Sequence, residues 1–435
     1  MEGSVVQMSK GISAVKGRRV WDSRGRPTVE VEVHLAGGAV GRAIAPAGAS
    51  TGSAEAVDKR DGGSAFGGFD VMQALGNVNG EIAVALRGLD ASDQAAADQL
   101  MIDLDGSENK SRLGGNALVA TSMAIANAAA AEAGLPLWRY LAGDGKTCQL
   151  PLPEIQIFGG GAHAGRRVDV QDFMVIPIGA ESYEQALEWT AEVYHSAGAI
   201  MHDAGLLQGV ADEGGFWPAF DTNEQALDYL LRAIEKAGFT PGADLAISLD
   251  IAATDFGKAG EYRLAADGKT IDADGLSEML LGWLERYPIV AIEDPFGEDD
   301  AEAMAKFTTA AGKKVEVIAD DFICTNAARI QSAASIGACN TALIKPNQAG
   351  TLSETLAALN AARAAGWESI VSARSGETED TTIVHLAVGW GVRQLKVGSF
   401  SRSERMAKWN EGLRIAENLG QQGGRLPGRE SFPWG

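Results

Sequence analysis

Cysteine is scarce in this sequence. Among its 435 residues are three cysteines, Cys148, Cys324 and Cys339, which lie far apart and are odd in number. Such spacing argues against both a disulfide framework and a zinc site, because these usually require cysteines in pairs. We therefore expect three buried, reduced thiols.

Long apolar runs are also missing. The longest candidate, residues 117–134, is rich in alanine and is interrupted by serine, threonine and asparagine. It lacks the apolar content of a membrane span. The first 25 residues contain no continuous apolar stretch and no small-residue cleavage pattern, which argues against secretion. These features predict a cytoplasmic protein.

Basic residues are in deficit. The chain has 37 lysines and arginines against 58 aspartates and glutamates, a formal net charge of -21. A chain this acidic repels nucleic acids and anionic membranes, so we expect neither as a partner. If the substrate is a small anion, cationic side chains must gather in its site to reverse this field.

Length and periodicity predict two domains. At 435 residues and 46% hydrophobic content, the chain can bury a large core. Residues 28–45 alternate like two strands joined by a Gly-Gly turn, and helical patterns fill most of residues 70–142. We expect a smaller N-terminal α+β capping domain over residues 1–145, including an active-site lid loop after the second strand. Residues 146–435 would form the catalytic domain.

The larger domain has the rhythm of a β/α barrel. Short apolar runs that end in polar residues alternate with amphipathic helices, such as the one that Thr222 and Gln225 are expected to begin and Gly238 to end. Continuous apolar strands separated by helices indicate a parallel sheet buried on both faces. The runs are residues 172–180, 209–215, 245–250, 289–294, 315–321, 341–348, 369–376 and 394–399. Eight such runs predict a closed barrel.

In such a barrel the chemistry lies at the carboxyl ends of the strands. The residues at these ends are mostly ionisable: Asp172, Glu213, Asp250, Glu293, Asp320, Lys345, Arg374 with Ser375, and Lys396. For any single residue, the alternative is a polar side chain that merely marks where a strand meets solvent. A whole ring of acids and lysines favours an active site.

Three of these carboxylates suit a metal ion. Asp250, Glu293 and Asp320 come from three successive strands, and Mg²⁺ prefers oxygen ligands of this kind. Lys345 and Lys396 follow on later strands. A lysine with a lowered pKa can act as a base, whereas a charged one is an electrostatic clamp. Together these groups suit abstraction of a proton alpha to a carboxylate.

Two further residues suggest how the rest of a substrate could be handled. Glu213 is a candidate acid for a departing hydroxyl. Arg374, with Ser375, can bind a phosphate through the paired donors of its guanidinium. The alternative for Arg374 is a salt bridge at the rim with Glu377 or Glu379.

These motifs together resemble the enolase family over almost the whole chain. The segments that carry the resemblance are DSRGRPTVEVEV, GASTG, DGSENKSRLGGNAL, GGAHAG, DEGGF, IEDPF, ADDFICTN, LIKPNQAG, RSGETED and SRSERMAKWNEGLRI. The resemblance implies an α/β fold in which a C-terminal enolase-type barrel follows a capping domain. It also implies a lyase with two Mg²⁺ sites, a small phosphorylated carboxylate as substrate, and a homodimer or larger homo-oligomer.

The resemblance assigns roles to individual residues. These are metal binding by Asp250, Glu293 and Asp320, proton abstraction by Lys345, carboxylate contact by Lys396, acid assistance by Glu213, phosphate contact by Arg374 and Ser375, and substrate contact by His163. Ser50 would lie on the lid that closes over the substrate, and it would supply the second magnesium site.

Four positions depart from the family's pattern. Enolases usually carry histidine where this chain has Ala373, glutamate where it has the catalytic Asp172, serine where it has Ala162, and asparagine where it has Gly159. We expect all four to lie in segments that surround the substrate. The side chain of Asp172 is one methylene shorter than glutamate, so its carboxylate lies further from the substrate. A misplacement of about 1 Å can cost roughly a hundredfold in rate. Ala373 removes an imidazole and leaves room for a larger group.

These truncations favour a pocket enlarged for a bulkier substrate. We expect an enolase-type lyase acting on a substituted 2-phosphoglycerate, similar to enolase-like enzymes of phosphonate and phosphinate antibiotic pathways, of the carboxyphosphonoenolpyruvate synthase type. One alternative is an ordinary glycolytic enolase, which makes phosphoenolpyruvate from 2-phosphoglycerate. Another is a non-catalytic enolase-like binding protein, but a disused site has no reason to keep like charges together.

Overall fold

The N-terminal lobe is built on a three-stranded antiparallel sheet. The computed structural model describes residues 9–435, of which residues 421–423 are described by their backbone alone. The sheet order is β1-β2-β3, with β1 at Ile12–Trp21, β2 at Pro27–Leu35 and β3 at Val40–Ile44. The predicted hairpin is therefore confirmed, whereas the sequence analysis does not predict β1.

One long buried helix covers this sheet. The helices of the lobe are η1 (Ala65–Gly68), α2 (Met72–Asn77), η2 (Val78–Ile82), α3 (Ala83–Leu86), α4 (Gln94–Asp105), α5 (Gly115–Glu132) and α6 (Leu137–Ala142). The alanine-rich run of the sequence forms α5, which packs on β2 and β3. A Cβ on Gly41 would lie 2.1 Å from the Ala128 backbone nitrogen, so this glycine permits the close approach.

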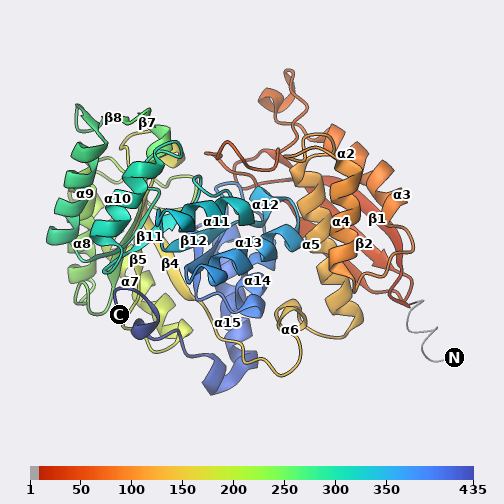
Figure 1. The fold of residues 1–435 in the computed structure, drawn as a ribbon. Coiled ribbons are helices and arrows are strands. Elements are labelled where there is room, and N and C mark those ends of the chain that lie inside the picture. Colours follow the sequence, from red (N-terminus) through yellow and green to blue (C-terminus); the bar gives the residue numbers. More distant parts are fainter. Residues whose placement is uncertain (1–8) are drawn as a thin grey trace.

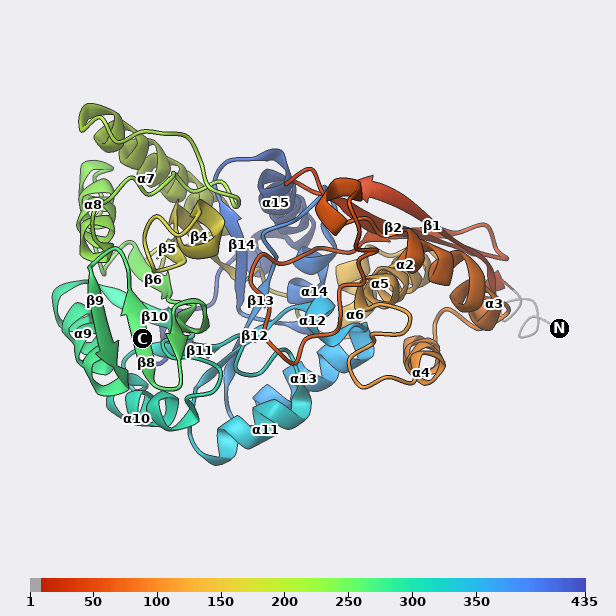
Figure 2. The same cartoon turned by 90° about the horizontal axis from the view of Figure 1, so that it is seen from above.

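An eight-stranded closed barrel forms the second lobe, beside the first (Figure 1). The strand order around the barrel is β10-β11-β12-β13-β14-β4-β5-β6 (Figure 2). The strands are β4 (Leu152–Gly159), β5 (Asp172–Ile176), β6 (Ala246–Asp250), β10 (Ile289–Glu293), β11 (Glu316–Ala319), β12 (Thr341–Ile344), β13 (Glu368–Ser372) and β14 (Gln394–Ser399). The predicted closed barrel is confirmed.

Two details of the predicted barrel are wrong. Residues 209–215 form a loop with isolated bridges, because their glycines and charges leave little apolar surface to bury, and β4 takes the eighth place. In addition, β5 runs antiparallel to both β4 and β6. Asp172 is the first residue of β5, and this reversal places it opposite Asp250, the last residue of β6. Asp172 therefore still reaches the catalytic rim.

Helices surround the barrel, and a small antiparallel sheet lies at its edge. The helices are η3 (Gly161–Ala164), α7 (Tyr183–Asp203), α8 (Asn223–Lys236), η4 (Ala253–Asp255), α9 (Ala273–Arg286), α10 (Ala301–Ala311), α11 (Ala327–Ser335), α12 (Pro346–Ala349), α13 (Leu352–Ala364), α14 (Thr382–Trp390), α15 (Ser403–Gly423) and η5 (Arg429–Ser431). The small sheet consists of β7 (Gly257–Lys258), β8 (Glu261–Leu264) and β9 (Lys269–Asp272). Thr222 Oγ1 accepts the Gln225 backbone N–H at 3.1 Å, which confirms the predicted start of α8.

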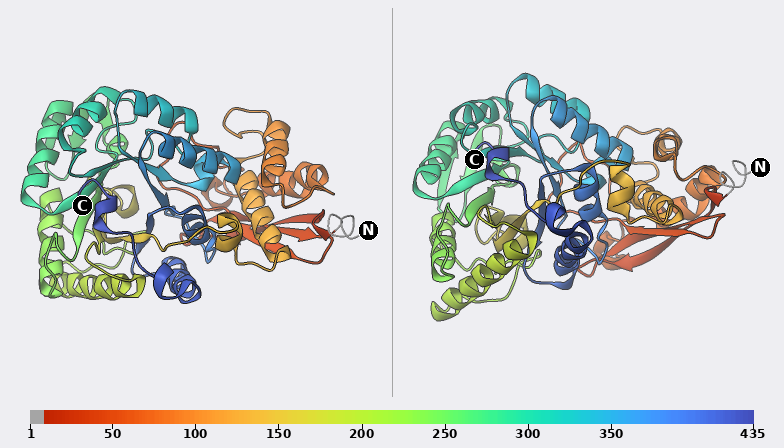
Figure 3. Two further views of the ribbon diagram at one scale, coloured as in Figure 1. Left: turned by 60° about the horizontal axis from the view of Figure 1, so that its bottom comes forward. Right: turned by 90° about the horizontal axis from the view of Figure 1, so that it is seen from below.

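The lid loop, residues 46–63, crosses from the N-terminal lobe to the top of the barrel beside β12 and β13 (Figure 2). Ala47 exchanges two backbone hydrogen bonds with Gly376, and the Ala56 N–H donates to the Gln348 carbonyl at 2.8 Å. The C-terminal segment lies on the opposite face of the barrel (Figure 3), where Arg393 Nη1 donates to the Ser431 carbonyl at 3.2 Å. The two ends of the barrel are thus covered by different parts of the chain.

Two other expectations concern the described residues as a whole. All three cysteines are buried and free, as predicted. Across residues 9–435, none of the helices combines the length and the apolar content that a membrane crossing requires.

Buried acids occupy the barrel interior below the rim. Glu154 and Glu316 are both fully buried. Glu154 accepts a hydrogen bond from the Ser248 hydroxyl, and Glu316 Oε1 accepts one from Gln394 Nε2 at 2.7 Å. Burial, together with the negative charge of Glu154, raises the pKa of Glu316 to about 8. A proton therefore stays on Glu316 at neutral pH.

Glu316→Gln should remove part of the loss of stability with rising pH. Between about pH 4.5 and pH 8 the folded protein keeps a proton on Glu316 that the unfolded chain has lost, so this group costs about 1.4 kcal/mol of stability per pH unit. The penalty is absent below the unfolded pKa and complete above the folded one. Urea unfolding of both proteins across this range measures the difference. Equal pH slopes, or the same effect in the exposed control Glu285→Gln, would contradict it.

Candidate active site

The predicted site residues gather at one pocket at the top of the barrel. The pocket is lined by Ala49, Ser50, His163, Gln171, Asp172, Glu213, Asp250, Lys345, Ser372, Ala373, Arg374, Ser375, Lys396 and Val397. Two predicted residues, Glu293 and Asp320, are not part of this lining. Each forms an ion pair with a lysine that does line the pocket. Glu293 pairs with Lys396, and Asp320 pairs with Lys345. Every predicted site residue thus lies at the pocket or in contact with a residue that lines it.

Lys396 is the centre of a buried charge cluster. Its Nζ donates to Asp250 Oδ2 at 2.9 Å and to Glu293 Oε2 at 2.7 Å, and it lies 3.5 Å from Asp172 Oδ2. Burial alone would lower the pKa of this lysine, but the surrounding carboxylates, Asp250 first among them, outweigh burial and raise it. Lys396 is therefore a cation, as expected for an electrostatic clamp.

Lys345 is also charged in this arrangement. It forms an ion pair with Asp320, whose other oxygen accepts a hydrogen bond from Gln348 Nε2 at 2.8 Å. Burial would lower the pKa of Lys345, but the Asp320 carboxylate outweighs it, so the pKa is raised. This differs from the lowered pKa that a base requires. The cause is the pairing with Asp320, so a cation held by that carboxylate would compete with the lysine for it.

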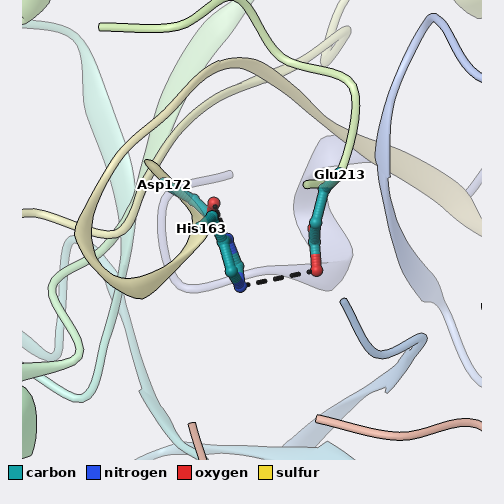
Figure 4. A group of neighbouring side chains, drawn as sticks. All are labelled: His163, Asp172 and Glu213. Atoms are coloured by element: carbon teal, nitrogen blue, oxygen red, sulfur yellow. Dashed lines mark hydrogen bonds and ion pairs between the residues drawn. The ribbon is translucent and has the colours of Figure 1, made fainter. Parts of the chain in front are cut away.

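His163 lies between two carboxylates (Figure 4). Its Nδ1 is 3.1 Å from Asp172 Oδ1, and its Nε2 is 3.7 Å from Glu213 Oε1. Burial lowers the pKa of His163, but the charges of Glu213 and Asp172 prevail and raise it to about 9. At neutral pH the imidazole therefore carries a proton beside Glu213. Although it is one methylene shorter than glutamate, Asp172 reaches both His163 and Lys396.

The acids of the rim fit a hard divalent cation. Asp250, Glu293 and Asp320 present only oxygen, and Glu293 Oε1 is buried without a hydrogen-bond partner among the described residues. Such an orphaned acceptor is expected where a cation binds. Among the described residues, two other groups have potential ligand atoms that all lie within 4.8 Å of one another, His163 with Asp172 and Glu213, and Asp294 with Asp320 and Asp321. In the predicted trio, the Lys396 ammonium bonds to both Asp250 and Glu293, and Asp320 pairs with Lys345.

Asp294 supports the rim from behind. Its two oxygens accept the backbone N–H groups of Asp320 and Asp321 at 2.9 and 2.8 Å. Its backbone adopts a left-handed conformation, with φ of 40°, which costs free energy in a non-glycine residue. These contacts fix the direction in which Asp320 leaves β11. Asp294 is therefore a supporting residue.

Arg374 has a partner that the sequence analysis does not predict. Its guanidinium pairs with Glu55 of the lid loop, with Nη1 2.9 Å from Oε2. Of the two acids considered as alternatives, Glu377 instead accepts the Arg374 backbone N–H at 3.0 Å. Ser375 Oγ accepts a longer hydrogen bond, at 3.4 Å, from Arg24 Nη1. No local sequence pattern links Glu55 to Arg374, because the two are 319 positions apart.

The four departures from the family's pattern have different surroundings. Ala373 and Asp172 line the pocket, whereas Ala162 and Gly159 are not among its lining residues. A Cβ on Gly159 would lie 2.6 Å from the Ala211 side chain, so glycine is required here by packing. The segment that contains Gly159 and Ala162 reaches the pocket through His163. The two departures that line the pocket are Ala373, in place of the family's histidine, and Asp172, in place of its glutamate.

Comparison with known families agrees with this geometry. The N-terminal domain of enolase matches residues 12–141, and the enolase C-terminal TIM barrel domain matches residues 147–432. The chain therefore belongs to the enolase family. It has the barrel, the capping lobe and the acidic rim of a magnesium-dependent enolase-type lyase in general. The domain boundary after residue 145 lies between the two matched ranges and stays a prediction.

Asp172→Asn should lower the pKa of His163 by about one unit or more, because a close negative charge is removed. The imidazole resonances of His163 can be followed by NMR as a function of pH, and the wild type should titrate near pH 9. The other four histidines serve as internal controls. Titration of His163 near its ordinary value in the wild type, or an unchanged value in the variant, would contradict the pairing.

Proposed function

We propose that this protein eliminates water from a substituted 2-phosphoglycerate to give a phosphoenolpyruvate-like product. The observation that supports this most directly is that the short side chain of Ala373 lines the same pocket as Lys345 and Lys396. The lysines and acids supply the chemistry of the family. The short side chain of Ala373, where the family usually carries histidine, favours a substrate with an additional group, as in phosphonate or phosphinate biosynthesis.

The proposed reaction begins with proton abstraction by Lys345 from the carbon alpha to the substrate carboxylate. Lys345 must first give up its proton and its pairing with Asp320. Lys396 keeps its charge, because three carboxylates surround it, and it contacts the substrate carboxylate as negative charge develops there. A magnesium ion held by Asp250, Glu293 and Asp320 would supply further stabilisation of that charge. Ser50 is the proposed ligand of a second ion.

Departure of the hydroxyl requires a proton at the opposite side of the pocket. Glu213 is the proposed acid, and it would receive the proton that it passes to the hydroxyl from the protonated imidazole of His163, whose Nε2 lies 3.7 Å from Glu213 Oε1. Asp172 holds that imidazole through Nδ1 and is itself held by Gln156. The proton leaves with the hydroxyl as water. The phosphoryl group would be bound by Arg374 and Ser375.

The proposed partners follow from the same chemistry. The substrate is a small phosphorylated carboxylate, and the cations at the pocket, Lys345, Lys396 and Arg374, reverse the acidic field of the chain locally. We also propose a homodimer or larger homo-oligomer, on the precedent of the family. Nucleic acids and membranes are not proposed as partners.

An ordinary glycolytic enolase is the second candidate function. It is favoured by the presence of every lysine and acid that the reaction requires, and by the contact that Asp172 still makes with His163. The two candidates differ in whether unsubstituted 2-phosphoglycerate is a good substrate. A non-catalytic binding protein is the third, and it would be stabilised by magnesium without turning over any phosphoglycerate derivative.

The variant Ala373→His with Asp172→Glu should turn over 2-phosphoglycerate about a hundredfold faster than the native chain, because it restores the groups that position the unsubstituted substrate. Absorbance of the enol product, with and without magnesium, measures both rates. Turnover by the native chain at the rate of an ordinary enolase would favour the second candidate and defeat the enlarged pocket.

Lys345→Ala should reduce exchange of the alpha proton with solvent by about a thousandfold, because the other lysine that lines the pocket, Lys396, is held as a cation by Asp250 and Glu293 and cannot replace the base. Deuterium incorporation, followed by NMR or mass spectrometry, measures exchange separately from water loss. The control Lys306→Ala removes an exposed lysine that pairs with Glu302. Persistent exchange in Lys345→Ala would assign the base to another residue.

A further inference from the structure

The guanidinium of Arg374 has nearly all of its donors engaged by the protein. Nη1 donates to Glu55 Oε2 at 2.9 Å and to Asn347 Oδ1 at 3.1 Å. Nη2 donates to the Ser50 carbonyl at 2.9 Å and to Glu55 Oε1 at 3.2 Å. These contacts use the four terminal N–H bonds. Among the described residues, nothing accepts a hydrogen bond from the fifth, on Nε.

Glu55 forms a two-oxygen pair with Arg374 in a site with little access to water. The two side chains are 3% and 7% exposed. Paired charges at this depth interact far more strongly than they would at the surface. Burial would lower the pKa of Arg374, but the Glu55 carboxylate outweighs it and raises the pKa. The pair therefore competes strongly with any other anion for the same donors.

The lid loop is shaped to deliver Glu55 to this position. A Cβ on Gly48 would lie 1.9 Å from Arg374 Nη2, and a Cβ on Gly52 would lie 2.4 Å from Cys324 Sγ. Both glycines therefore permit the lid backbone to approach the barrel. Glu55 Oε1 also accepts the Gly52 N–H at 3.0 Å, which folds the lid around the carboxylate.

The same carboxylate is connected to the acidic rim. Gln348 Nε2 donates to Glu55 Oε1 at 3.2 Å and to Asp320 Oδ1 at 2.8 Å. Release of Glu55 would therefore free one side of Gln348 as well as the Arg374 donors. Gln348 thus connects Asp320 to Glu55, the lid residue that holds the Arg374 guanidinium.

We propose that Glu55 determines the affinity of the site for oxyanions, because a phosphoryl group can take the paired Arg374 donors only by displacing the Glu55 carboxylate. This inference rests on the proposed function in one respect, the assignment of Arg374 to the phosphoryl group. The carboxylate acts as a tethered competitor, and an anion that displaces it also releases the Gly52 N–H that donates to Glu55. Weakly charged compounds cannot displace it, so the competition also selects for a phosphoryl-sized charge.

Glu55→Gln tests the competition with inorganic phosphate as the probe. A neutral amide pairs less strongly with the guanidinium. If the pair is closed in about nine-tenths of the molecules, its loss tightens phosphate binding by about tenfold. Isothermal titration calorimetry measures the change without any turnover. Unchanged or weaker phosphate binding by a folded Glu55→Gln protein would overturn the proposal, since it would mean that Glu55 positions Arg374 instead.

Two controls separate competition from other effects of the lid. Glu298→Gln removes the carboxylate that accepts the Ser53 N–H and hydroxyl, at 3.1 and 3.0 Å, and leaves Arg374 untouched. Its phosphate affinity should match the wild type. In an Arg374→Gln background, Glu55→Gln should bring no gain. A gain in either case would overturn the proposal in favour of general lid loosening or of simple charge repulsion.

A measurement on the wild type covers the case in which Glu55→Gln does not fold. Phosphate should speed hydrogen exchange at the Gly52 amide, which donates to Glu55. Slower or unchanged exchange at saturating phosphate would overturn the proposal. These outcomes are independent of catalysis. Absence of turnover with every phosphoglycerate would defeat the proposed function alone, whereas failure of the phosphate tests with turnover intact would defeat this inference alone.

Discussion

The structure depends on the balance between buried lysines and buried carboxylates at the top of the barrel. Isolated ionised groups at this depth would cost far more free energy than a folded domain has in reserve. Lys396 and Lys345 are therefore held by Asp250, Glu293 and Asp320, and these acids keep the two lysines charged, because they raise the pKa of each against the effect of burial. The reactivity of the site and the stability of the rim thus have the same origin.

This balance explains why the sequence is informative about the site. Apolar strands that end in a single ionisable residue predict both the barrel and its catalytic rim, because in a closed barrel the strand ends must meet. The burial of β6 and β10, which end in Asp250 and Glu293, follows directly from that pattern. The two enolase family models match residues 12–141 and 147–432, which lie within the two domains that the sequence predicts. Most of the prediction of the barrel and its rim therefore comes from one repeated pattern, an apolar strand that ends in an ionisable residue.

The parts that the sequence does not predict depend on long-range geometry. β4 escapes detection because Glu154 and Gln156 face a polar barrel interior, where alternation of apolar residues is not required. The reversed direction of β5 has no local signal either. Glu55 and Gln348 come from separate segments, and only the folded lid brings them together. The pKa of Lys345 likewise depends on where the Asp320 carboxylate points, at the end of the neighbouring strand β11.

The reversed strand has a consequence for how this barrel can change during evolution. Elsewhere in the barrel, successive parallel strands need a return crossing, and helices such as α9 and α10 separate the strands from one another in the sequence. Between β4 and β5 the chain instead turns back at the rim through residues 160–171, which include His163. His163 and Asp172 are thus carried by one short connection. An insertion in residues 160–171 would displace both His163 and Asp172. An insertion between α9 and β10, or between α10 and β11, would displace neither.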